Sequence, residues 1–171
     1  MPQIEPINEL IDRLWNEKQV SVVSNGRNCS ATLSCENSIF DVSLIDQEAS
    51  RAIGFIMVYR SRDNYKIENP TWGEERHPGC EEKNFVGLEV TEYYRNQGFG
   101  PLLIDIGIGI AQKDFKEKGY TPPFVIRANG INRKLAERFY KPLGFEILEN
   151  PLAARYNNPD IVPSQLMGNH Q

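Results

Sequence analysis

Residues 101–118 restrict the fold most, because their apolar side chains fill one wide arc of a predicted helix. That arc contains Leu103, Ile104, Ile106, Gly107, Ile108, Ile110, Ala111 and Phe115. The opposite arc contains Asp105, Gln112, Lys113 and Lys116. A helix with so broad an apolar surface packs on a β-sheet, so the sequence predicts a domain in which this helix covers one.

Strand signals lie on both sides of the long helix. Seven stretches are apolar, alternate in polarity or flank turn residues, as strands do: residues 20–23, 31–34, 39–45, 52–59, 85–90, 124–127 and 145–148. Residues 6–16 and 132–140 have helical spacing instead. The first four strands form two hairpins, and the later ones alternate with helices. The predicted fold class is therefore α/β (α+β), with a mixed, mostly antiparallel central sheet flanked by helices.

The 171 residues are expected to form a single domain, 1–171. Within it, residues 61–83 are polar, show no period, and are long enough for a functional or disordered connection. This segment contains Glu68, Glu74, Glu75, Glu81 and Glu82. The glutamates form either an ordinary solvated surface or a negative field that attracts a cationic ligand.

Composition excludes several classes of partner. A formal charge of −4 argues against nucleic acid and against anionic membranes, which select clustered Lys and Arg. No apolar run has membrane-spanning length, and the N-terminus does not resemble a signal peptide, so a cytoplasmic location is expected. Three cysteines do not suggest a disulfide framework, and His77-Pro78-Gly79-Cys80 has no second pair of ligands, so no metal is expected. The sequence leaves monomer and homodimer open.

A glycine-containing turn separates the 85–90 strand from the long helix. It consists of Arg95, Asn96, Gln97, Gly98, Phe99 and Gly100. Two glycines at a helix N-terminus can leave successive backbone N–H groups pointing into one concavity, where phosphate is the natural occupant. On its own, a Gly-x-Gly turn before a helix is more often only a tight turn.

The context of this turn resembles a known family. The pattern Leu88-Glu89-Val90, Tyr94-Arg95-x-x-Gly98-x-Gly100, Leu102-Leu103 resembles the acyl-CoA-binding motif of the GNAT N-acyltransferase superfamily. The pattern Asn132-x-x-x-Ala136-x-x-Phe139-Tyr140-x-x-x-Gly144-Phe145 resembles the second motif of that family. The resemblance is strong over 85–149, extends plausibly to 39–59, and is absent from the atypical N-terminal region 1–38.

The resemblance implies a GNAT fold, splayed at the acyl-CoA-binding strand, with acetyl-CoA (acyl-CoA) as co-substrate. The strand of Leu88, Glu89 and Val90 would pair with the pantetheine arm through its backbone. The turn would wrap the pyrophosphate with backbone N–H groups of Asn96, Gln97, Gly98, Phe99 and Gly100, beside Arg95. Asn132 and Tyr140 would lie near the pantetheine and the sulfur, although Asn132 is equally suited to be a helix N-cap. Pro101 removes one N–H just after the turn.

The resemblance also implies a mechanism. Tyr140 would donate a proton to the departing thiolate, and the Val90 N–H would stabilise the developing oxyanion. Some relatives carry a glutamate base where this chain has Asn84. Glu82 or Glu89 would act as the base through water, or each is simply a solvated carboxylate, so the base stays unassigned.

The expected activity is acyl transfer, most simply of acetyl, to a primary amine of a small molecule or peptide, with a cationic acceptor favoured. Three alternatives stay open. The chain could be a catalytically silent acyl-CoA-binding sensor, or it could acylate the amino group of charged tRNA, which the net charge disfavours. It could also use a longer acyl donor, if Gly107 provides space for the chain rather than close packing between helix and sheet.

Overall fold

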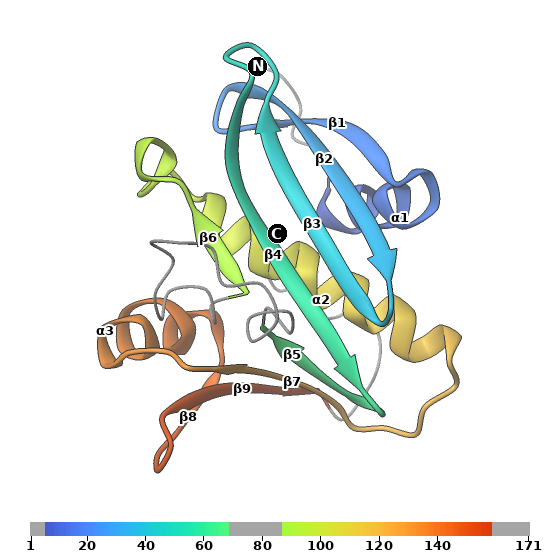
Figure 1. The fold of residues 1–171 in the computed structure, drawn as a ribbon, viewed down its shortest axis with the longest axis vertical. Helices are drawn as coiled ribbons and strands as arrows, with labels where there is room; N and C mark the ends of the chain where they lie inside the picture. Colours follow the sequence, from blue (N-terminus) through green and yellow to red (C-terminus); the bar gives the residue numbers. More distant parts are fainter. Residues whose placement is uncertain (1–5, 69–86, 159–171) are drawn as a thin grey trace.

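The computed structural model describes residues 6–68 and 87–158 (Figure 1). The helical elements are α1 (Ile7–Glu17), η2 (Glu92–Tyr94), α2 (Phe99–Glu117), α3 (Arg133–Leu135), η3 (Ala136–Tyr140) and η4 (Lys141–Leu143). The strands are β1 (Gln19–Ser24), β2 (Arg27–Glu36), β3 (Ile39–Asp46), β4 (Arg51–Ser61), β5 (Asn64–Ile67), β6 (Leu88–Val90), β7 (Phe124–Asn129), β8 (Glu146–Leu148) and β9 (Ala153–Asn158). The protein is a mixed α/β fold.

The strands form one sheet in the order β1-β2-β3-β4-β5-β7-β9-β8, and β6 pairs with β4. The β5–β7 pair is parallel and the other pairs are antiparallel, so the predicted mixed, mostly antiparallel sheet is confirmed. Both predicted hairpins are present, β1 with β2 and β3 with β4. The sequence prediction missed β9 and took β5 for part of a structureless connection, and that part of the prediction is wrong.

Two strands share one edge of β4. The Glu68 N–H donates to the Met57 carbonyl at 3.2 Å, and the Met57 N–H donates to the Gly87 carbonyl at 2.6 Å. Glu68 and Gly87 therefore lie opposite the same residue. β5 and β6 are two parts of one line of chain along β4, interrupted by residues 69–86, which lie outside the described residues.

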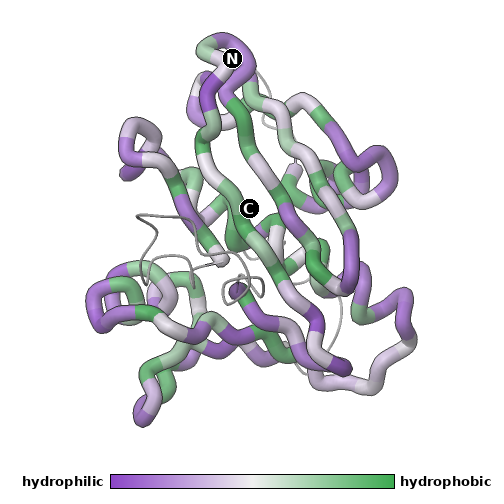
Figure 2. Tube along the Cα trace, viewed as in Figure 1, coloured by the Kyte–Doolittle hydropathy of each residue, from purple (hydrophilic) through white to green (hydrophobic). Residues whose placement is uncertain are grey.

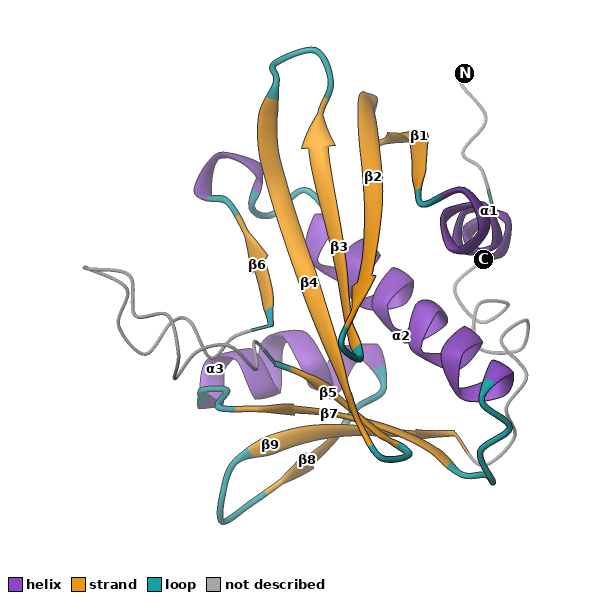
Figure 3. Cartoon of the chain, turned by 45° about the vertical axis from the view of Figure 1, so that its right-hand side comes forward, coloured by secondary structure: helices purple, strands orange, loops and turns teal. Residues whose placement is uncertain are grey.

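The helices pack on one face of the sheet. α2 packs against β3, β4, β6 and β7, and α1 packs against α2 (Figures 1 and 3). On the same face, the Tyr140 ring of η3 contacts Phe145, which contacts Tyr156 of β9. Tyr156 is the register partner of Ile126, a fully buried residue on the α2 side. The opposite face of the sheet carries no helix among residues 6–68 and 87–158.

The sheet covers one side of α2 and α1 covers another. A Cβ on Gly107 would lie 2.5 Å from Ile56 Cδ1, so this glycine serves close helix-to-sheet packing and provides no space for an acyl chain. α1 packs Ile11 against Gly109, and Lys113 pairs with Asp12. Gln112, expected on a polar arc, is instead fully buried, because α1 covers this second side of α2.

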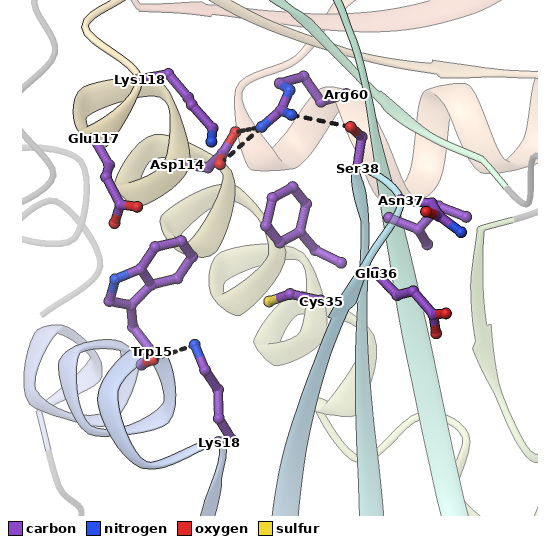
Figure 4. Close-up of a pocket in the computed structure, with 12 residues that line it drawn as sticks. Trp15, Lys18, Cys35, Glu36, Asn37, Ser38, Arg60, Asp114, Glu117 and Lys118 are labelled. Carbon is purple, nitrogen blue, oxygen red and sulfur yellow. Dashed lines mark hydrogen bonds and ion pairs between the residues drawn. The ribbon is translucent and has the colours of Figure 1, made fainter.

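A buried ion pair ties the C-terminal part of α2 to the sheet. Arg60 Nη1 donates to both carboxylate oxygens of Asp114, at 2.9 and 2.7 Å, and Arg60 Nη2 donates to Ser38 Oγ at 3.0 Å (Figure 4). The buried Tyr65 hydroxyl donates to Asp114 Oδ2 at 2.6 Å. Burial first, and then the bond to Asp114, raise the pKa of Tyr65 far above its usual value. One carboxylate therefore joins α2, β4 and β5.

We expect Asp114→Asn to destabilise the protein by about 3 kcal/mol, because it leaves the Arg60 guanidinium partly buried without a counter-ion. Urea unfolding followed by circular dichroism measures the loss. Glu117→Gln, one turn further along on the exposed side of α2, is the control and should change the unfolding free energy by less than about 0.5 kcal/mol. Equal effects of the two variants would contradict a structural role for the ion pair.

Candidate functional site

The turn before α2 forms a cradle of backbone donors. Gly98 adopts φ +84°, Asn96 adopts φ +61°, and α2 begins at Phe99. The first backbone bond into the helix runs from the Leu102 N–H to the Gly98 carbonyl at 3.3 Å. The N–H groups of Phe99 and Gly100 precede it and have no intrahelical acceptor. The turn thus presents unbonded donors at the positive end of a 19-residue helix, an arrangement suited to phosphate.

A buried carboxylate, which the sequence analysis did not predict as a site residue, fixes the cradle to the core. Asp46, buried at the end of β3, accepts a 2.7 Å bond from the Tyr94 hydroxyl and a 3.3 Å bond from Arg27. The Tyr94 bond is the main cause that lowers the pKa of Asp46. The buried Phe99 ring packs edge-on against Tyr94, so both ends of the turn are fixed to the core.

β6 leaves one backbone edge without a strand partner among the described residues. The Thr91 N–H donates to the Ile53 carbonyl at 2.8 Å, and Gly87 accepts from Met57, so alternate residues of this segment bond to β4. Leu88 and Val90 therefore direct their backbone groups away from β4. β6 pairs with no strand other than β4 in the described part of the chain, and β7 pairs with β5 instead. Strand pairing is therefore interrupted between β6 and β7 among these residues, and this interruption is called the gap below.

Arg95 and Gln97 use their side chains for local structure. Arg95 Nε donates to the Val90 carbonyl at 2.9 Å, which occupies that oxygen and leaves the Val90 N–H open. Gln97 Nε2 donates to the Tyr93 carbonyl at 3.1 Å, and its Oε1 accepts from Asn25 at 3.3 Å. What Gln97 can offer a ligand is its backbone.

The second motif lies beside the cradle. A Cβ on Gly100 would lie 3.3 Å from the ring of Phe139, so α2 and η3 meet there. Tyr140, the next residue, is 2% exposed between Phe139 and Phe145. Burial raises the pKa of its hydroxyl well above the usual value, so Tyr140 stays protonated at neutral pH. It lies in a π-helical turn, a distortion that often marks functional sites.

The remaining predicted site residues divide into three groups. Asn132 Oδ1 accepts from the Leu135 N–H at 2.8 Å, so Asn132 is the helix N-cap, one of the two roles expected. Glu89 is exposed and lies in register with Phe55, on the sheet face opposite the helices. Glu82 and Asn84, together with Glu74, Glu75 and Glu81, lie outside the described residues.

A separate hollow of about 340 Å³ lies near the C-terminal end of α2 (Figure 4). Its walls include Trp15, Lys18, Cys35 and the Arg60–Asp114 pair. Its charged groups are of both signs, and the buried pair in its wall is mutually satisfied. Within residues 6–68 and 87–158, no cluster of three or more His, Cys, Asp or Glu is arranged to hold a metal ion. No helix of this part of the chain has the length and apolarity to span a membrane.

Comparison with known proteins relates this fold to acyltransferases. No family model and no curated protein matches the sequence. Among solved structures, the cAMP-binding acyltransferase from Mycobacterium smegmatis matches with a TM-score of 0.56 and 11% identity, over 95% of this chain and 56% of that one. Two mutants of it match at 0.54 and 0.53, with 10% and 11% identity, over 94% of this chain and 58% and 57% of theirs. The chain thus spans a little over half the length of these proteins, and the likeness is one of fold.

The cradle can be tested by charge at Gly98. We expect coenzyme A to raise the melting temperature of the wild type with increasing concentration. Gly98→Asp should abolish that rise, because it places a carboxylate where phosphate would sit. Gly98→Asn is the matched control, since Asn has the same shape and also tolerates positive φ. If the Asp variant keeps the wild-type response to coenzyme A, the cradle is not the phosphate site.

The Asp46 anchor predicts a particular dependence on acid. A carboxyl whose folded pKa is lowered stabilises the fold above its unfolded pKa of about 3.9, and this contribution disappears as pH falls through the folded value. Asp46→Asn should therefore lower the melting temperature at pH 7, and its difference from wild type should shrink below about pH 4. Thermal unfolding between pH 2.5 and pH 7 measures this. A difference independent of pH would show that the charge of Asp46 is not what matters.

Proposed function

We propose that this chain is an acyl-CoA-dependent N-acyltransferase of the GNAT type. The observation that carries the proposal is that three features are neighbours in the fold: the open backbone edge of β6 leads into the cradle at Gly98–Gly100, and Gly100 meets Phe139, the residue next to Tyr140. The likeness in fold to an acyltransferase supports it. The donor we propose is acetyl-CoA, and the acceptor is a primary amine of a small molecule or peptide.

The residues present fit the chemical groups of coenzyme A. The pyrophosphate is anionic and needs N–H donors, which the first turn of α2 presents through Phe99 and Gly100. The pantetheine arm carries amides, and these match the outward backbone groups of Leu88 and the Val90 N–H. When bound, this co-substrate supplies an acyl thioester, a carbonyl activated by a good leaving group.

The transfer forms a C–N bond and breaks a C–S bond. A neutral amine attacks the thioester carbonyl directly, and the Val90 N–H stabilises the negative charge that develops on the carbonyl oxygen. The thiolate leaves and takes a proton from Tyr140, the amine gives up one proton to the base, and Tyr140 regains a proton from solvent, so the products are an amide and free coenzyme A. Burial keeps the Tyr140 hydroxyl protonated, as a proton donor must be, and the same burial makes it a weaker acid than an exposed tyrosine.

Removal of the amine proton needs a base. Glu89 is a described carboxylate on β6, exposed on the sheet face opposite the helices. We propose that Glu89 acts through water. Glu82, the other candidate from the sequence, lies outside the described residues.

A silent acyl-CoA-binding sensor is the second candidate, favoured by the depth at which Tyr140 is buried. The sensor would bind coenzyme A without releasing a thiol from acetyl-CoA. The transferase would release free coenzyme A in proportion to the acetylated amine. A thiol-release assay over a panel of amines, with products identified by mass spectrometry, separates the two functions.

Tyr140→Phe removes one hydroxyl and almost no volume, so stability and coenzyme A binding should barely change. We expect kcat to fall about 10²- to 10⁴-fold if Tyr140 is the general acid. Tyr156→Phe is the control, because Tyr156 belongs to the same aromatic cluster through Phe145. A kcat within about twofold of wild type would leave Tyr140 a packing residue.

A further inference from the structure

The sheet face opposite the helices carries a row of cations. Lys66 of β5 is the register partner of Arg127 of β7, and Arg127 is the register partner of Arg155 of β9. Register partners point to the same face, and neighbouring strands lie only about 4.8 Å apart. In Figure 2 this end of the sheet alternates between hydrophilic and hydrophobic residues, as strands that bury one face do.

The row is only partly neutralised. Arg155 Nη2 pairs with Glu146 Oε2 at 2.7 Å, whereas Lys66 and Arg127 have no ion pair or hydrogen bond with any described residue. The Nε atoms of Arg127 and Arg155 are buried and have no hydrogen-bond partner among residues 6–68 and 87–158. Like charges on adjacent strands repel, and a buried N–H without an acceptor is costly. An anion seated between Lys66 and Arg127 would relieve both.

The row lies next to the proposed reaction site. Ile67 and Ala128 are the last register partners of β5 and β7, and Lys66 and Arg127 are the pair before them. Beyond Ile67 the edge of β4 is taken by β6 instead of β5, and β6 does not pair with β7 in the described part of the chain, so the gap begins there. Lys66 and Arg127 are therefore one residue, about 3.3 Å along the strand, from the start of the gap.

The two faces of the gap differ in what they can receive. α2, with the cradle at its N-terminus, and the η3 helix with Tyr140 lie on one face, which is where coenzyme A would bind. The other face has no described helix over it and carries the cationic row together with Glu89. With coenzyme A on the helix face, the face that bears Lys66 and Arg127 is the one left for the acceptor of the proposed transferase.

We propose that the acceptor is an amine that also carries a carboxylate, an amino acid or a close analogue, and that Lys66 and Arg127 bind this carboxylate. The guanidinium of Arg127 matches a carboxylate in a two-pronged geometry, and Lys66 adds a point charge. Held there, the carboxylate places the amine beside the start of the gap. This inference names the acceptor of the proposed transferase and rests on that function.

The test compares amino acids with the amines that lack only the carboxylate. The pairs are phenylalanine with phenethylamine, lysine with cadaverine, and arginine with agmatine, each with acetyl-CoA. We expect the wild type to prefer at least one amino acid over its amine by at least about tenfold in kcat/KM. Arg127→Gln should reduce that preference by roughly 10- to 100-fold, the size of a charge-assisted hydrogen bond, while the KM for acetyl-CoA stays unchanged.

Lys116→Gln is the matched control, since it removes one exposed cation from the helix side and should leave the preference intact. Arg127→Lys, which keeps the charge, should retain part of it. 3-Phenylpropionate, which has the carboxylate of phenylalanine but no amine, gives a readout besides turnover. It should raise the melting temperature of the wild type and not that of Arg127→Gln. If Arg127→Gln does not fold, Lys66→Gln takes its place in each measurement.

The outcomes distinguish a failure of the carboxylate site from a failure of the proposed acyltransferase activity. If amines are acetylated but the amino acids have no advantage, or if Arg127→Gln leaves the preference unchanged, the carboxylate site is overturned and the transferase stands. If acetyl-CoA releases no thiol with any member of the pairs, the proposed transferase fails, and the acceptor site fails with it.

Discussion

The site depends on how one edge of β4 is divided between two strands. β5 pairs with one half of that edge and also with β7, so the sheet continues there. β6 pairs with the other half and, among the described residues, with β4 alone. Since β6 has no partner on its far side within the described residues, Leu88 and Val90 keep backbone groups available. Gly54 makes the pairing possible, because a Cβ there would collide with the Glu89 carbonyl. An unpaired strand edge, normally a liability, is here available to the ligand that we propose.

The open edge would have little use if the turn after it moved freely. Asp46 and Tyr94 fix that turn to the end of β3, and Arg95 bonds back to Val90. Contacts with β3 and β6 therefore fix the turn, and a contact with α2 fixes the η3 turn that carries Tyr140. Such preorganisation reduces the ordering cost of binding.

The sequence correctly predicts those elements whose structure is set by a local pattern of residues. The apolar arc of α2, the Asn25-Gly26 hairpin and the helix at 6–16 follow from periodicity and turn chemistry, and all are present. β5 has only four residues and lies inside a long polar segment, so it is too short for an alternating pattern to reveal it. Gln112 illustrates a second limit. Helical spacing predicts which face of α2 is apolar, but it does not predict that α1 covers another face of the same helix. The pairing of Lys66 with Arg127 depends on register between strands about sixty residues apart, and local patterns carry no such information.

Because strand register cannot be predicted from local patterns, the net charge of the chain is a poor guide to the charge at one place on its surface. A chain with formal charge −4 would be expected to favour cations. Yet the two faces of the sheet beside β6 carry positive groups, the N-terminus of α2 on one face and Lys66 with Arg127 on the other. At an ionic strength near 0.15 M, charges more than about 8 Å away are largely screened. The charge that a ligand would meet is therefore set by the few groups nearest to it, and the pairing of β5 with β7 brings two cations together that the net charge does not reveal.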